Sequence, residues 1–405
     1  MYHAKEHSSA LDGCSIPFLA ATGWQKSGRI AVYYRERQAA LCRGNTIQPA
    51  NLLAKRISVK SITGVLVLFL FLVMGNTAAQ NKAISKKEFF TDDQLIEMTM
   101  VADFKKLINE KMKKDYKQNF IPAALTCLFP DSTKVTAGIE VRARGKYRRE
   151  ECFFPPVMLN FNTPGAGILR KFGHLKLVLP CGSQSNDEQL VLKEYLAYKI
   201  YNLLTEKSFR VRLVKVECQD VNTTKKPRIS HAFFIEDIDD VGKRNSCEEV
   251  QSIKFHTERT NREQTTLVSL FQYMIGNNDW AVPVYQNIKL VRSKKDSLLY
   301  PFVVPYDFDH SGLVNAEYAL PPPELPITSV RQRLYRGFPR KMEELQAALQ
   351  IFRRQREAMN ALILNLEPLT KGNKKEMIKY LDEFFELTEK EKEVKDIFIR
   401  NARAE

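Results

Sequence analysis

Alternating and apolar segments in the middle of the chain predict strands on both sides of one long helix. Residues 134–141 and 209–216 alternate between polar and apolar side chains, which is typical of half-buried strands. Residues 188–204 instead repeat apolar side chains at helical spacing, and Asn186 can cap that helix. Further strands are expected at 120–129, 157–161, 174–179 and 232–236.

Helical patterns flank this strand-rich part. Asp92 and Asp93 precede an amphipathic run that ends at Leu107, and an acidic start of this kind predicts a helix. Further helices are expected at 265–275, 342–366 and 374–399, the last two as an antiparallel pair. The expected fold class is therefore α+β. It comprises an N-terminal extension at 1–55, a signal peptide at 56–79, a helical lead segment at 80–119, a β-rich part at 120–237 and a mainly helical part at 238–405.

The run at 62–74 has the pattern of a signal peptide. Basic residues precede it, and the small residues Thr77 to Ala79 follow it. The run is shorter than the ~20 residues that usually span a bilayer. We therefore expect cleavage after Ala79, export to the periplasm or secretion, and no stable membrane span afterwards. A membrane anchor at 62–74 is the alternative, and the true start of translation stays open because residues 1–55 show weak periodicity.

Composition and charge narrow the class of partner. A hydrophobic content of 44% in 405 residues is enough for a real core, and the net charge of +15 favours an anionic ligand or surface. The basic residues are spread along the chain without a zinc-finger, homeodomain or RNA-recognition signature, so no specific nucleic-acid partner is expected. Oligomeric state is not encoded in these patterns.

Five cysteines follow the expected cleavage site. They show no CxxC spacing and no paired histidines, so a structural zinc site is not expected. Export favours disulfides, but the odd number leaves at least one thiol unpaired and the pairing stays open. The five are Cys127, Cys152, Cys181, Cys218 and Cys247.

Polar residues at 276–287 and 304–312 carry the candidate chemistry. Asn287 begins an apolar segment, and a second apolar segment leads into Asp307, so a hairpin between them would bring these side chains together. Carboxylate and amide oxygens are ligands that Mg²⁺ prefers. Asp279 lies before the hairpin, where it can accept a proton from a hydroxyl nucleophile. A helix cap and a turn are the structural alternative for this segment.

Two charged residues of the β-rich part fit the same chemistry. Lys176 lies inside an apolar strand, so its ammonium needs a partner or a route to solvent. Glu194 shares the apolar face of the long helix and can hold that lysine. The alternatives are an edge-strand lysine and a surface glutamate.

In this order the residues resemble the CotH family of atypical protein kinases and, more closely, exported bacterial proteins with the same motifs. The resemblance covers about residues 120–340. It rests on the Arg-Gly pattern at 141–145, the lysine-bearing strand, the long helix, the strand that ends at Glu236, and the segments 278–287 and 305–309.

The resemblance implies a protein-kinase-like two-lobed fold with an N-terminal antiparallel sheet, one long helix and a mainly helical C-terminal lobe. It also implies ATP or another nucleotide and Mg²⁺ as cofactors, and a protein substrate. Asp279 would be the catalytic base. The implied nucleotide-binding residues are Lys176, Glu194, Arg144 and Glu236, and the implied metal ligands are Asn287, Asp307 and Asp309.

This chain departs from ordinary kinases in two respects. It has no GxGxxG phosphate loop, for which Arg144 and its basic neighbours can substitute by charge, and the interval from Asp279 to Asn287 is longer. Two other functions stay open. One is a catalytically inactive surface or envelope binding module, anchored by a segment such as 331–336, and the other is a hydrolase with a metal held by Asp307, Asp309 and His310.

Overall fold

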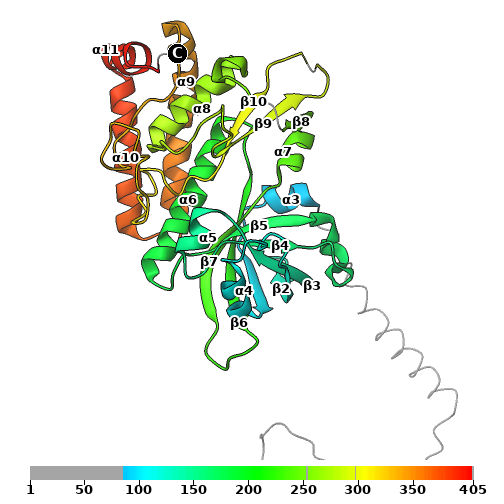
Figure 1. The fold of residues 1–405 in the computed structure, drawn as a ribbon. Coiled ribbons are helices and arrows are strands. Elements are labelled where there is room, and N and C mark those ends of the chain that lie inside the picture. The colour runs from blue at the N-terminus through cyan, green and yellow to red at the C-terminus, as the bar shows by residue number, and fades with distance from the viewer. Residues whose placement is uncertain (1–84, 252–253, 297, 404–405) are drawn as a thin grey trace, which may run out of the picture. The chain divides into compact units, whose positions relative to one another are not determined.

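The computed structural model describes residues 85–251, 254–296 and 298–403 (Figure 1). The extension expected at 1–55 and the signal peptide or anchor expected within 56–79 lie outside the described residues. The described residues belong to one compact unit. Among the described residues, no helix has the length and apolar character needed to cross a membrane.

A closed barrel of seven strands forms the lower part of the molecule in Figure 1, in the order β1-β2-β3-β4-β5-β7-β6. Neighbouring strands are antiparallel except β1 and β6, whose parallel pairing closes the barrel. The strands are β1 (Ile96–Ala102), β2 (Ile121–Leu128), β3 (Lys134–Ala143), β4 (Val157–Asn160), β5 (His174–Val178), β6 (Val211–Asp220) and β7 (Arg228–Ile235).

This closed mixed barrel shows that the expected two-lobed kinase fold with an N-terminal antiparallel sheet is wrong. The difference begins at β1, in the segment for which the sequence predicted a helix from Asp92 to Leu107. Alternate residues of β1 are buried, among them Met98 and Met100. Pairing on both edges, with β2 and β6, satisfies the backbone of β1 and outweighs its helical pattern.

Helices and a small sheet form the upper part of Figure 1, while short helices border the barrel. The sheet has the order β10-β9-β8. Its strands are β8 (Cys247–Val250), β9 (Ile288–Ser293) and β10 (Phe302–Pro305). The helices are α3 (Lys86–Thr91), α4 (Phe104–Glu110), α5 (Tyr147–Glu151), α6 (Ser185–Leu204), α7 (Ile238–Arg244), α8 (Arg262–Ile275), α9 (Met342–Asn365), α10 (Lys371–Thr388) and α11 (Glu391–Lys395). Two 3₁₀ helices, η1 (Pro164–Phe172) and η2 (Thr257–Arg259), and a π-helix, η3 (Asp396–Arg400), are also present.

The expected long helix is confirmed as α6, and the helix expected at 265–275 is confirmed as α8. The expected C-terminal pair is confirmed as α9 and α10, which pack against each other, although the second helix ends near Thr388. Residues 391–400 form α11 and η3.

Strand β7 joins two apolar cores. Ala232 and Phe234 belong to the cluster that fills the barrel, whereas Phe233 and Ile235 belong to the cluster under the helices. Successive side chains of a strand point to opposite faces, so one strand can serve both cores. The second cluster includes α6, whose residues are buried on most sides. This packing sets the helix that carries Glu194 against the outer face of the barrel.

Gly276 ends α8 with a left-handed backbone, φ 65°, and leads into the segment that carries Asp279. A Cβ at this position would collide with the hydroxyl of Tyr380.

We expect Gly276→Ala to lower the free energy of unfolding by about 2–4 kcal/mol, through the left-handed strain and the overpacking. Gly372→Ala is the matched control, because a Cβ there meets nothing within 4 Å and the residue lies in α10. Chemical denaturation should show loss only for Gly276→Ala; equal stability of the two variants would contradict this account.

Candidate functional site

The expected hairpin between the two polar segments is confirmed. Strands β9 and β10 pair antiparallel, with Ile288 opposite Pro305, and the Tyr306 amide donates to the Asn287 carbonyl at 3.0 Å. Asn287 and Asp307 therefore flank the same end of the hairpin. Both have left-handed backbones, with φ of 50° and 64°. Asn and Asp tolerate this conformation better than other non-glycine residues, which suits them to the point where each strand meets its loop.

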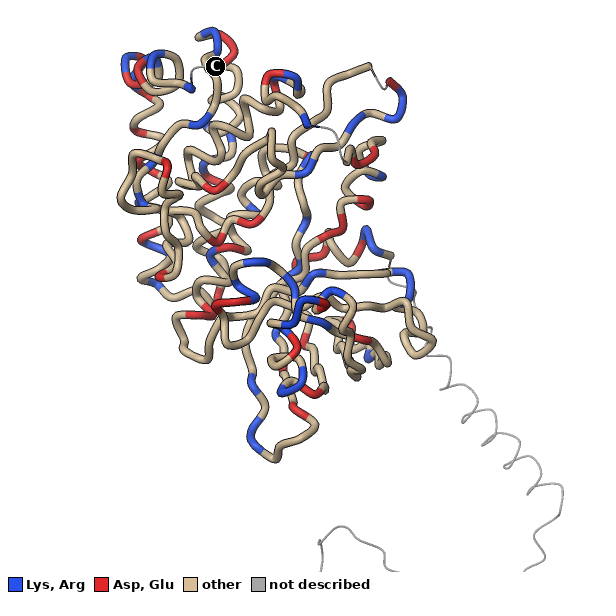
Figure 2. Tube along the Cα trace, in the orientation of Figure 1, with Lys and Arg blue, Asp and Glu red and all other residues tan. Residues whose placement is uncertain are grey.

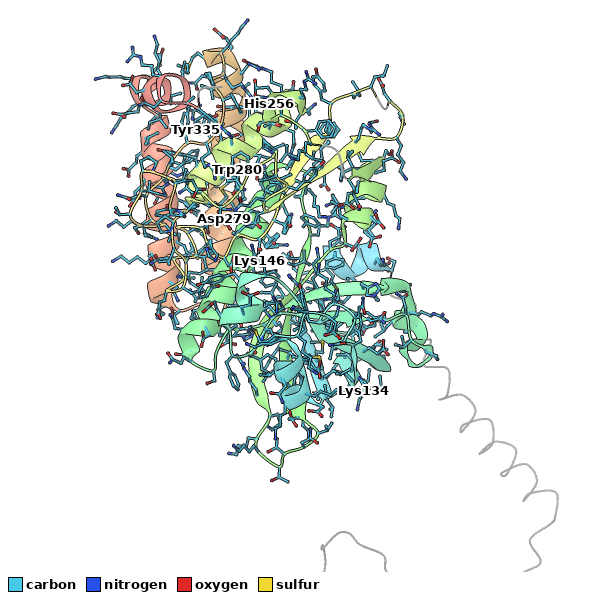
Figure 3. All side chains as sticks on the ribbon, viewed as in Figure 1. Lys134, Lys146, His256, Asp279, Trp280 and Tyr335 are labelled. Carbon is cyan, nitrogen blue, oxygen red and sulfur yellow. A yellow bond between two sulfur atoms is a disulfide. The ribbon has the colours of Figure 1, made fainter. Side chains whose placement is uncertain are left out.

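Asp279 is held by the residue that was expected to share its site. The Asn287 side-chain amide donates to the Asp279 carboxylate and to its backbone carbonyl, each at 2.8 Å. The side-chain amide of Gln286 donates to the other carboxylate oxygen of Asp279. The backbone amide of Asp279 donates to the side-chain oxygen of Asn277 at 3.0 Å. The longer interval forms a turn closed by pairing of Ala281 with Gln286. Figure 3 shows Asp279 beside Trp280, above Lys146 in this view.

Glu194, Asp307 and Asp309 form a second group of side chains, which we call the acidic cluster. Glu194 and Asp309 are buried. Arg148 donates to the Glu194 carboxylate at 3.2 Å and to the Leu179 carbonyl at 2.6 Å. The buried ion pair therefore joins α5, which follows β3, to α6.

The carboxylates of this cluster repel one another. Withdrawal from water raises the pKa of Asp307 to about 6, and the charge of Asp309 adds to the rise, while Arg144 and Arg148 oppose it. Burial likewise raises the pKa of Glu194 well above its usual value, with a further contribution from Asp309 and opposition from Arg148. Arg144 thus acts on the acidic cluster, and its Nε has no hydrogen-bond partner.

Two tyrosines that the sequence did not single out complete this cluster. The Asp307 amide donates to the Tyr198 hydroxyl at 2.8 Å, and the Tyr318 hydroxyl donates to the Asp309 carboxylate at 3.1 Å. Tyr198 was recognisable only as a helical residue, and Tyr318 lies in an irregular segment. No spacing in the sequence connects either one with an aspartate.

Lys176 lies near the acidic cluster but does not reach Glu194. Its ammonium lies 5.8 Å from the ring centre of Phe209 and 5.7 Å from that of Tyr306. Burial and, to a smaller extent, the charge of Arg144 lower its pKa to about 8, against the opposing effect of Asp237 and Asp307. In the described part of the chain, Lys176 forms no ion pair, so the Lys176–Glu194 contact expected from the sequence is absent. Glu194 forms its ion pair with Arg148 instead.

Glu236 has a structural set of contacts. Its carboxylate accepts hydrogen bonds from the Arg244 side chain at 3.1 Å and from the Arg210 amide at 3.0 Å. These contacts tie the end of β7 to α7 and to the start of β6. The next residue, Asp237, contributes to the electrostatic field at Lys176, as does Asp307.

The segment 331–336, expected as an exposed anchor, instead holds the loops of the site. Arg331 donates to the Gly312 carbonyl at 2.9 Å, and Arg333 donates to the Met274 carbonyl at 3.2 Å. Arg336 donates to the Asn278 carbonyl. These arginines satisfy carbonyls next to α8 and to Asp279, a role that their sequence spacing does not reveal.

A preformed metal site is not present among the described residues. No group of three or more His, Cys, Asp or Glu side chains there is arranged to hold a metal ion. The hydrolase alternative required Asp307, Asp309 and His310 to converge on one ion. His310 instead packs between the rings of Tyr147 and Tyr318, at 5.2 and 5.7 Å.

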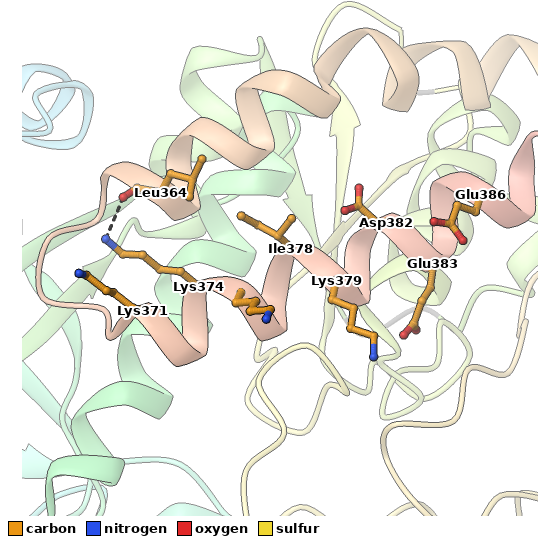
Figure 4. Close-up of a pocket in the computed structure, with 9 residues that line it drawn as sticks. Leu364, Lys371, Lys374, Ile378, Lys379, Asp382, Glu383 and Glu386 are labelled. Carbon is orange, nitrogen blue, oxygen red and sulfur yellow. Dashed lines mark hydrogen bonds between the residues drawn. The ribbon is translucent and has the colours of Figure 1, made fainter.

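Other hollows lie outside this site. A groove of about 620 Å³ follows α10, with lysines toward one end and acidic residues toward the other (Figure 4). It shares no residue with the acidic cluster. Lys and Arg alternate with Asp and Glu along much of the chain in Figure 2, so the positive net charge is not confined to one element.

Comparisons with known proteins do not test the resemblance to the CotH family. No known family model matches the chain, and no curated protein matches its sequence. The similarity to the CotH family therefore rests on the motif residues themselves.

Replacing Lys176 tests how strongly its surroundings disfavour the charged ammonium. At neutral pH the folded state holds a lysine whose charged form is disfavoured, so we expect Lys176→Met to raise the free energy of unfolding by about 1–3 kcal/mol. In the wild type the charged Lys176 lowers the free energy of unfolding by its full amount below pH 8. This loss disappears as the pH rises from about 8 to 10.5, because in that range the unfolded chain binds more protons than the folded chain. Denaturation at pH 7 to 10 should show the advantage of the variant shrinking. Lys134→Met, at an exposed position in β3, is the control, and a pH-independent difference would refute this reading.

Breaking the buried ion pair should be costly. Arg148→Met leaves Glu194 without its cation, and we expect a loss of about 3–5 kcal/mol in the free energy of unfolding. In a Glu194→Gln background the same substitution should cost less than half as much, because no buried charge remains unpaired. Arg210→Met removes a pair with an exposed partner, Glu206, and should cost no more than about 1 kcal/mol. Urea titrations of the four variants measure these differences, and equal costs for Arg148→Met in both backgrounds would contradict the coupling.

Proposed function

We propose that this protein is an exported, Mg²⁺-dependent phosphotransferase that moves a phosphoryl group from ATP or another nucleotide to a hydroxyl of a protein substrate. The observation that supports it best is the hairpin of β9 and β10. This hairpin places Asn287, already hydrogen-bonded to Asp279, at the same end as Asp307. A base, an amide and a carboxylate in this order are the parts that phosphoryl transfer requires.

In the proposed reaction the substrate hydroxyl oxygen forms a bond to the terminal phosphorus of the nucleotide. The bond from that phosphorus to the bridging oxygen breaks, and the nucleoside diphosphate leaves with the electron pair. Asp279 accepts the hydroxyl proton, and its hydrogen bonds from Asn287 and Gln286 orient its carboxylate. Lys176 and Arg144 supply positive charge that compensates the phosphates.

We propose that Mg²⁺ binds this site together with a nucleotide and not as a preformed ion. Magnesium usually takes one or two carboxylates and completes its shell with phosphate oxygens and water. A preformed cage of three carboxylates is therefore not required. Asp307, Asp309 and Asn287 would hold the ion, which would neutralise charge on the phosphates.

A disulfide between Cys152 and Cys181 supports export, because such bonds persist in oxidising compartments. It joins the segment after α5 to the segment after β5, close to Arg148. The remaining described cysteines, Cys127, Cys218 and Cys247, are buried free thiols.

A catalytically inactive binding module is the second candidate. It is favoured by the engagement of Glu194 with Arg148, which leaves Lys176 without a carboxylate partner. An inactive module would fold with the same stability whether nucleotide and Mg²⁺ are present or not.

Nucleotide binding separates the two candidates. We expect Mg²⁺ with ATP to raise the Tm of the full chain and radiolabel from γ-labelled ATP to appear on protein. Asp307→Asn should abolish the metal-dependent part of both signals, whereas Asp279→Asn should retain nucleotide binding and reduce transfer by at least about 100-fold. Asp296→Asn, in the loop between β9 and β10, is the matched control and should behave as the wild type. Absence of metal-dependent binding by the wild type would refute the phosphotransferase.

A further inference from the structure

Helix α10 turns one face away from the apolar core, and this face carries opposite charges at its two ends. The buried face of the helix, with Met377, Leu381 and Phe384, packs into the core under the helices. The other face lines the groove of about 620 Å³ in Figure 4, with lysines near the start of the helix and acidic residues near its end. In Figure 1, α10 lies at the outer edge of the helical region. We call this outward side of α10 the charged face.

The charged face is matched to itself around the midpoint between Ile378 and Lys379. Three of its lysines each have an acidic residue at the same distance on the other side of this midpoint. These matched positions are Lys371 with Glu386, Lys374 with Glu383, and Lys375 with Asp382. When two identical helices pack antiparallel about a two-fold axis, residues at equal distances from the axis face each other. A second copy of α10 would therefore place a carboxylate opposite each of these three lysines, whereas parallel packing would place lysine against lysine.

Within one chain this order of charges is unfavourable. The N-terminus of a helix favours acidic residues and its C-terminus favours basic ones, but α10 has no acidic residue in its first turn and no basic residue in its last. Like charges also recur at a spacing of four, in Lys371 with Lys375 and in Asp382 with Glu386, and such pairs destabilise a helix. A partner of opposite charge at each end compensates both effects.

Several of these charges are available to a partner. In the part of the chain that the structure describes, the side chains of Lys371, Lys375 and Glu386 form no hydrogen bond or ion pair. Asp382 and Glu383 pair with arginines of their own chain at 2.7 and 3.0 Å, yet their side chains remain 31% and 45% exposed. A carboxylate has room for several donors, so each can accept a further lysine.

We propose that the charged face of α10 is a homodimer interface, on which a second copy of the chain packs its own α10 antiparallel. Near the two-fold axis, Lys379 of one copy would lie beside Ile378 of the other, where its alkyl chain covers the apolar side chain. Leu364 of α9, which also lines the groove and is 56% exposed, adds apolar surface. The interface goes beyond the proposed function and does not depend on it.

The size of this face sets the strength of the contact. Helix α10 has 18 residues and is therefore about 27 Å long. A single helix pair with apolar residues only near its centre is smaller and more polar than the interface of an obligate dimer. The dimer is therefore reversible and depends on its charge pairs, which salt screens.

Sedimentation velocity of the full chain tests this interface. We expect dimers that weaken at least about tenfold between about 0.1 M and about 1 M salt, because the Debye length falls from about 10 Å to about 3 Å. Lys371→Glu with Lys375→Glu makes the charged face acidic, and Asp382→Lys with Glu386→Lys makes it basic. Each double variant alone should dimerise at least about tenfold more weakly than the wild type, because like charges then face each other.

A mixture of the two double variants provides the decisive measurement. In equal amounts they should form a mixed dimer, because every reversed residue of one variant then faces its opposite in the other. Recovery of the dimer also shows that both variants are folded. If Asp382→Lys disturbs the fold beside Arg356, Glu386→Lys mixed with Lys371→Glu makes the same test, since neither native side chain has a partner in the described part of the chain.

Lys134→Glu with Lys225→Glu is the matched control. It changes the net charge by the same amount at two exposed positions, in β3 and in the loop between β6 and β7, and should dimerise as the wild type does. A wild type that stays monomeric at low salt would overturn the interface. Dimers that persist in both double variants would place the contact on another face and would overturn it too, as would folded variants whose mixture forms no dimer.

Discussion

The arrangement of this site depends on one constraint, the burial of carboxylates that need cations nearby. Glu194 and Asp309 are buried inside the protein, and Asp307 is half-buried. Charges cannot be withdrawn from water without partners, so Arg148 must come close enough to pair with Glu194. That requirement connects α5, α6 and the end of β10, and the disulfide of Cys152 with Cys181 lies in the same region.

The same constraint explains how the polar residues are divided. Asp279 and Asn287 satisfy each other at the end of the hairpin, while the acidic cluster is compensated by Arg144 and Arg148. Lys176 belongs to neither group of hydrogen bonds, and its lowered pKa reflects an ammonium short of partners. In the proposed function, the phosphates of the nucleotide would supply a partner for this ammonium.

The closed barrel has its own consequence for the site. Because β7 buries alternate side chains in two cores, the barrel and the helical region cannot shift independently at this strand without exposing one of the cores. The helix that carries Glu194 is therefore fixed on the barrel. The irregular segment around Tyr318 packs on the site through ring contacts with Tyr147 and His310.

Local pattern alone determined the long helix α6, the helix α8 and the hairpin that joins Asn287 to Asp307, because side-chain periodicity and turn residues act over a few neighbours. Tertiary structure decided what those patterns do not contain. Strand β1 replaced an expected helix because β2 and the distant β6 pair with its two edges, and the parallel pairing with β6 closes the expected antiparallel sheet into a barrel. Arg148, rather than Lys176, became the partner of Glu194 because a buried charge is satisfied by whichever cation the fold brings within reach.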